Sequence, residues 1–64
     1  MKVKYDKDVD VLYITFSDRP VKESDEDKRD VIIDYAENGD VVGIEILNAS
    51  KQLTNPTKVE YEVA

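Results

Sequence analysis

Three aspartates near the N-terminus have the types and spacing that could bind a metal ion. Asp6, Asp8 and Asp10 form the Asp-x-Asp-x-Asp pattern that opens a calcium-binding loop. Such a loop also needs Gly at its sixth position and Glu at its twelfth. Val11 and Ser17 stand at those places, so the pattern favours a turn whose carboxylates bond backbone N–H groups. We predict no metal site here, and weak metal binding is kept as an alternative.

A second pair of carboxylates, Asp34 and Glu45, is placed diagonally on one face of a predicted β-hairpin. Neighbouring carboxylates can split their pKa values and act as acid and base. Such chemistry also needs a cleft of several hundred cubic ångströms, and a small sheet offers little concavity. We therefore expect two solvent-facing charges and no catalytic residues, with a small carboxylate-based enzyme or metal binder as the alternative.

The run Glu23-Ser24-Asp25-Glu26-Asp27 places four acids within five residues. It could be a weak divalent-cation site or an acidic docking strip for a basic partner. Runs of charge are usually solvated, and the flanking bases Lys22, Lys28 and Arg29 dilute the field of this one. We expect a weak edge strand around residues 21–23 followed by a polar loop.

Composition excludes several classes of protein. The chain has 64 residues, a net charge of −6, and no His, Cys or Trp. Zinc, haem and iron–sulfur sites lose their usual ligands, and His- or Cys-dependent catalysis is impossible. The acidic balance argues against a nucleic-acid partner, and no apolar stretch is long enough to span a membrane. We expect one small cytoplasmic domain, residues 1–64, without a cofactor.

The elements that must position these carboxylates are mostly strands, because the hydrophobic pattern repeats every two residues. Residues 2–5 alternate, and residues 9–16 are rich in β-branched and aromatic side chains. The second of these segments is apolar on both faces. Something must therefore cover its second face: closure of the sheet into a sandwich or barrel, or a second copy of the chain.

The strongest hairpin joins residues 31–36 to residues 41–47 through a turn that contains Asn38-Gly39. We predict Ala36 opposite Val41, with these pairs following along the strands: Tyr35 with Val42, Ile33 with Ile44, and Val31 with Ile46. A three-residue loop would instead place Glu45 on the face of Ile33, at a cost of several kcal/mol. Gly39 is expected to need a positive φ, whereas Gly43 should accept Ala unless another group packs against it.

After this hairpin, Asn48 is expected to cap a short helical turn over residues 49–53. Residues 58–63 alternate between charged and apolar side chains, which predicts a half-exposed edge strand. The fold class that follows is mainly β: an antiparallel β-meander of five to six strands with one short helix or helical turn near residues 48–53.

Three segments carry a resemblance to a known family. They are KVKYDKDVDVLYI at the start of the chain, VIIDY followed by a glycine turn, and VVGIEILNASK at residues 41–51. Over residues 1 to about 51 the chain resembles a widespread family of short prokaryotic proteins, domain-of-unknown-function family 2283. The resemblance implies a small β-rich fold and a prokaryotic, cytoplasmic source, and it brings no catalytic residues. Some members are encoded beside small toxin-like proteins, which suggests an antitoxin-like role.

We therefore expect a small acidic protein-interaction module that is not an enzyme. It should form a homodimer and could neutralise a small basic protein, because a charge of −6 would steer such a partner. The residues expected at the dimer interface are Val11, Tyr13 and Tyr61. A purely structural homo-oligomer is a further alternative.

Overall fold

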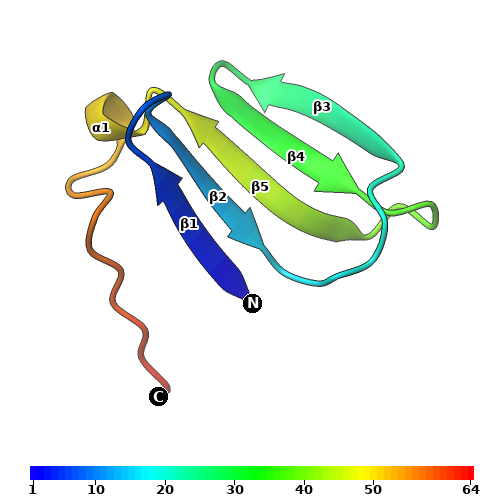
Figure 1. The fold of residues 1–64 in the computed structure, drawn as a ribbon. Helices are drawn as coiled ribbons and strands as arrows, with labels where there is room; N and C mark the ends of the chain where they lie inside the picture. Colours follow the sequence, from blue (N-terminus) through cyan, green and yellow to red (C-terminus); the bar gives the residue numbers. More distant parts are fainter.

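The computed structural model describes residues 1–64 as one open antiparallel sheet followed by a short helix (Figure 1). The strands are β1 (Lys2–Asp6), β2 (Val11–Thr15), β3 (Glu23–Lys28), β4 (Val31–Tyr35) and β5 (Val41–Leu47), and the helix is α1 (Ala49–Gln52). The predicted class, mainly β with five antiparallel strands and one short helix, is confirmed. No helix in the structure is long and apolar enough to cross a membrane.

The strand order is β1-β2-β5-β4-β3, which departs from a simple meander at one connection. After β2 the chain crosses to the far edge of the sheet, and β3, β4 and β5 then return as consecutive neighbours (Figure 1). The charges of β3 explain this order. A strand of sequence ESDEDK cannot be buried between two neighbours, so it takes an edge and the apolar β5 lies beside β2.

The centre of the predicted hairpin register is confirmed, with Ile33 opposite Ile44 and Val31 opposite Ile46. The end near the turn is different. The Ala36 amide bonds the carbonyl of Asp40, which leaves three residues in the loop, and Tyr35 then pairs with Val41. A bulge follows at once and restores the register. The three-residue loop therefore does not move Glu45 to the face of Ile33, because the bulge absorbs the extra residue.

Three other strand predictions need correction. The acidic run forms a complete edge strand, β3, rather than a loop, because its backbone bonds that of β4. Residues 58–63 form no strand. Alternation alone is insufficient there, because a strand needs a neighbouring backbone to pair with. The C-terminal segment leaves α1 and runs on the β1 side of the molecule without joining the sheet (Figure 1). Val9 likewise belongs to the turn before β2 and is exposed.

The register divides the sheet into two faces, because cross-strand partners point to the same side. What we call the apolar face carries only apolar and aromatic side chains on its four strands β1, β2, β5 and β4: Val3, Tyr5, Leu12, Ile14, Val31, Ile33, Tyr35, Ile44 and Ile46. What we call the mixed face combines charged and apolar side chains: Lys4, Val11, Tyr13, Ile32, Asp34, Glu45 and Leu47.

Neither face has a second layer of secondary structure over it. The strands contact mainly their neighbours in the sheet, and six of the 64 residues are buried. One corner of the apolar face is partly covered, since Pro56 and Val59 of the C-terminal segment line shallow clefts with Leu12 and Val3. The sheet does not close into a barrel, because β1 and β3 lie at opposite edges.

Candidate functional site

Asp10, the last of the three N-terminal aspartates, holds α1 against the β1–β2 turn. Its carboxylate accepts hydrogen bonds from the Tyr5 hydroxyl (2.6 Å), the Ser50 hydroxyl (2.7 Å) and the Ser50 amide (3.0 Å). Its carbonyl accepts the amide of Ala49. These bonds, that from Tyr5 foremost, lower the pKa of Asp10. Asp10 therefore does the capping that was predicted for Asn48.

Asn48 itself has a positive φ of 52°, and its side chain makes no capping bond. Its amide nitrogen instead donates to Asp30, the residue with positive φ in the β3–β4 turn. Asp10 also has a positive φ, of 57°. All three residues are Asp or Asn, the non-glycine types that best tolerate this conformation.

The aspartates of the first turn do not converge on a metal site. Asp6 accepts the backbone amide of Asp8, a local turn contact, while Asp10 is engaged with Tyr5 and Ser50. No group of three or more acidic, His or Cys side chains in the structure could hold a metal ion.

Asp34 and Glu45 lie on the mixed face, where the structure brings them together as the sequence predicts. Burial against its apolar neighbours raises the pKa of Glu45, and the hydrogen bond and negative charge of Asp34 raise it further. Asp34 also accepts the Ser24 hydroxyl at 2.6 Å. Glu45 lines none of the described clefts, so nothing here positions a substrate over it.

The acidic strand β3 has one side with no neighbouring strand. Two of its carboxylates are used within the protein: Glu26 accepts the Asp30 amide, and Asp27 accepts the Tyr35 hydroxyl and thereby raises the pKa of that phenol. The carboxylates of Glu23 and Asp25 make no hydrogen bond or ion pair with the protein. The flanking bases make none with them either, because the two ion pairs of the structure are Arg19–Asp40 and Lys58–Glu60.

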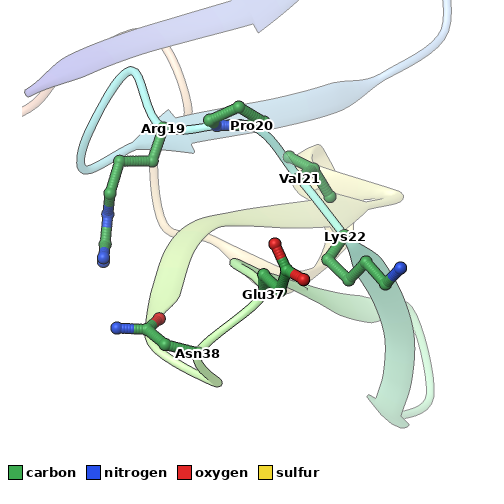
Figure 2. A pocket seen from close by; sticks show the side chains of 6 residues that line it. All are labelled: Arg19, Pro20, Val21, Lys22, Glu37 and Asn38. Carbon is green, nitrogen blue, oxygen red and sulfur yellow. The ribbon is translucent and has the colours of Figure 1, made fainter.

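A cleft of about 310 Å³ lies between the β2–β3 connection and the β4–β5 turn. Figure 2 shows Arg19 and Lys22 at its two ends with Glu37 between them. Its lining residues are all exposed, and its only aliphatic side chains are those of Pro20 and Val21. Arg19 is already paired with Asp40 at 3.0 Å, and this contact lowers the pKa of Asp40. The cleft therefore offers little that would hold a small molecule.

Of the three residues predicted for the interface, Val11 and Tyr13 lie on the mixed face and Tyr61 lies on the C-terminal segment. Val11 is buried, with 7% of its surface exposed, and Tyr13 is half-buried on the mixed face with the Lys4 ammonium 6.0 Å from its ring centre. Tyr61 lies on the C-terminal segment and is 79% exposed. The larger uncovered surface is the apolar face, whose composition was visible in the predicted register and whose full width depends on β2 pairing with β5.

Comparison with known proteins finds relatives of this chain, but none with a stated activity. A family model described as "Protein of unknown function (DUF2283)" matches residues 2–50. The "Uncharacterized protein MJ0789" of Methanocaldococcus jannaschii is 47% identical over 51 residues, which make up 80% of this chain. The chain spans only 43% of the length of that curated relative. No solved structure matches the chain significantly.

Proposed function

We propose that this chain, which belongs to the DUF2283 family of proteins of unknown function, is a non-catalytic module that binds a basic protein partner along the free edge of β3. A small toxin-like protein that it neutralises would be one such partner. The observation that carries the proposal is that the acidic run forms an edge strand whose outer backbone groups have no strand beside them.

Two features of β3 support this function. An edge strand presents a row of free N–H and C=O groups to which an extended segment of another protein can add as a further strand. Glu23 and Asp25 carry charges that no group of the protein neutralises, so they are available to lysine or arginine side chains of the partner. The net charge of −6 would speed the encounter with a basic protein.

The test is an NMR titration of the isotope-labelled protein with an octapeptide of alternating Lys and Val. We expect amide shift changes concentrated in β3, with slower hydrogen exchange of its outward amides. A peptide of alternating Glu and Val should produce neither. Shift changes spread evenly over the acidic surface, or located away from β3, would contradict the proposal.

A matched pair of charge reversals sharpens this test. Glu23→Lys changes β3, and Glu62→Lys makes the same change of charge on the exposed C-terminal segment. Long-range steering responds to both variants, whereas edge binding responds to the first. We expect Glu23→Lys to weaken peptide binding by roughly tenfold, and Glu62→Lys by about twofold or less.

A further inference from the structure

The apolar face is the largest feature of the molecule that the proposed function leaves unused. Val3, Ile14, Ile44 and Ile33 are successive cross-strand partners and form one apolar row across four strands, and Asp25 continues this row onto β3. A parallel row runs through Tyr5, Leu12, Ile46 and Val31. Apart from Leu12, these side chains are half-buried or exposed.

The exposed area has the size that a dimer requires. The chain exposes 5078 Å², about 900 Å² more than a compact monomer of its mass. Each partner in a standard protein interface loses about 800 Å². The C-terminal segment contributes to the excess, but the uncovered sheet face is its apolar part, and burying apolar area is what drives stable association.

The charges at the two edges decide how two copies can meet. β3 carries Glu23, Asp25, Glu26 and Asp27 against Lys28, whereas β1 carries Lys2 and Lys4 against Asp6. Pairing β3 with β3, or β1 with β1, would therefore place like charges side by side, which is unfavourable. Edge-to-edge dimers about a twofold axis are disfavoured, and the faces remain available.

Two twofold arrangements bring the apolar faces together. An axis perpendicular to the strands, in the plane between the sheets, stacks β1 over β1 and β3 over β3. An axis parallel to the strands stacks β1 of one copy over β3 of the other, so that Glu23 and Asp25 face the uncharged Val3 and Tyr5 while Lys2 and Lys4 point to the outer, mixed face. The first arrangement sets the Glu23 and Asp25 side chains of the two copies against one another, and the second avoids this repulsion.

We propose that the apolar face packs against the same face of a second copy, about a twofold axis parallel to the strands. The product is a two-layer sandwich whose core is formed by the two apolar cross-strand rows of each copy. This axis places Val3 of each copy opposite Asp25 of the other, because both residues lie in the same cross-strand row at opposite edges of the sheet. The outer backbone of β3 stays free in this dimer.

Site-directed cross-linking tests both the face and the axis, because the chain has no cysteine of its own. Val3→Cys and Asp25→Cys alter exposed side chains at the edges, so neither should prevent folding. A bis-maleimide reagent that spans about 10 Å matches the separation of packed sheets. We expect a cross-linked dimer when the two variants are mixed and none with either variant alone.

Each alternative gives a different result. Cross-linking of each variant with itself would overturn the axis, since it would place like edges together. Lys2→Cys mixed with Ser24→Cys samples one cross-strand row of the opposite face, through Thr15, Gly43 and Asp34. Cross-linking by this control pair instead would overturn the choice of face. Sedimentation of the unmodified protein as a 7.3 kDa species at about 100 μM would overturn the dimer itself.

Discussion

The two faces of the sheet are built from the same five strands, yet they pose different physical problems. The apolar face holds aliphatic and aromatic side chains with no charge among them until the sheet reaches Asp25. The mixed face places Lys4, Asp34 and Glu45 between apolar residues. Water is a poor solvent for the first surface and an adequate one for the second.

This difference shows how period-two alternation separates the side chains that avoid water from those that tolerate it. On the mixed face, burial and the neighbouring Asp34 carboxylate raise the pKa of Glu45, and the Lys4 ammonium lies over the Tyr13 ring. Charged groups there are tolerated because they reach solvent and one another. On the apolar face an added charge would have neither solvent nor an opposite charge beside it once the face is covered. A surface that covers the apolar face must therefore be apolar too.

The largest expected effect comes from a charge placed in the centre of the apolar face. Ile44 lies between Ile14 and Ile33 in the register, and Ile44→Asp should unfold the domain, at a cost of several kcal/mol that approaches the whole stability of a small protein. Thr15→Asp on the mixed face, where Thr15 is exposed, is the control and should shift the denaturant midpoint little. Cooperative melts of equal midpoint for both variants would erase the distinction between the faces.

A smaller effect is expected at Gly43, which lies close to the backbone of β2. A Cβ added at Gly43 would lie 2.8 Å from the carbonyl oxygen of Ile14, so the exception stated for this glycine applies and alanine does not fit freely. We expect Gly43→Ala to cost about 1–3 kcal/mol in denaturant melts, because the β2 backbone must shift. The sequence alone predicted that Gly43 accepts alanine more readily than Gly39 accepts a side chain, and with this close contact we expect the two costs to be similar.

Gly39 supplies the contrast to Gly43. Its φ of +90° requires a conformation that other residues adopt only with strain, but nothing lies within 4 Å of an added Cβ. Gly39→Ala should therefore cost about 1–2 kcal/mol from the backbone alone. A free energy of unfolding for Gly43→Ala equal to that of the parent protein would show that the two strands are further apart than described.

Asp10 lies in the turn between β1 and β2 and joins that turn to α1. Protonation of Asp10 should therefore weaken the fold. The pKa of Asp10 is lowered in the folded state, so its contribution is complete above the ordinary value of 3.8 and is lost as the pH falls through the folded pKa. At neutral pH, Asp10→Asn should lower the melting temperature by about 5 °C. The difference from the parent should shrink below pH 3.8, whereas Asp8→Asn should have little effect at any pH.

The smallest effect, of opposite sign, is expected at Glu45 on the mixed face. Its folded pKa lies above the ordinary value of 4.5, so the unfolded chain releases this proton first and stability falls as the pH rises from 4.5 through the folded pKa. Glu45→Gln should remove that loss and raise stability at neutral pH by less than about 1 kcal/mol. Melting temperatures between pH 4 and pH 8 test this, and a neutral-pH loss of stability would contradict it.

Local patterns were sufficient for most strands and for the centre of the main hairpin. Alternation identified β1, β4 and β5, and the cost of burying Glu45 selected the correct pairing of Ile33 with Ile44. The same reasoning predicted a different loop, because a bulge that compensates a three-residue loop has no separate signal in the residues. Alternation also predicted a strand at residues 58–63, where no neighbouring backbone exists.

For the candidate site, the sequence identified the right residues more often than the right roles. The Asp34–Glu45 pair and the acidic run were both recognised, yet the run was assigned to a loop rather than to an edge strand. Asp10 was considered as a metal ligand, and its bonds to Ser50 bridge 40 positions of the chain. Such a contact depends on where α1 is placed after five strands have assembled, so no local pattern announces it.

By itself the sequence determined the class of fold, the acidic character, the absence of His and Cys chemistry, and the separation of apolar from charged residues in alternate positions. Tertiary structure alone decided that β2 lies beside β5, because strand order depends on which charged strand can tolerate an edge. That one pairing joins Ile14 to Ile44 and makes a continuous apolar face out of the β1–β2 hairpin and the three strands β3, β4 and β5. Alternation specifies which side of a strand avoids water, but only the assembled sheet adds those sides into one continuous apolar surface.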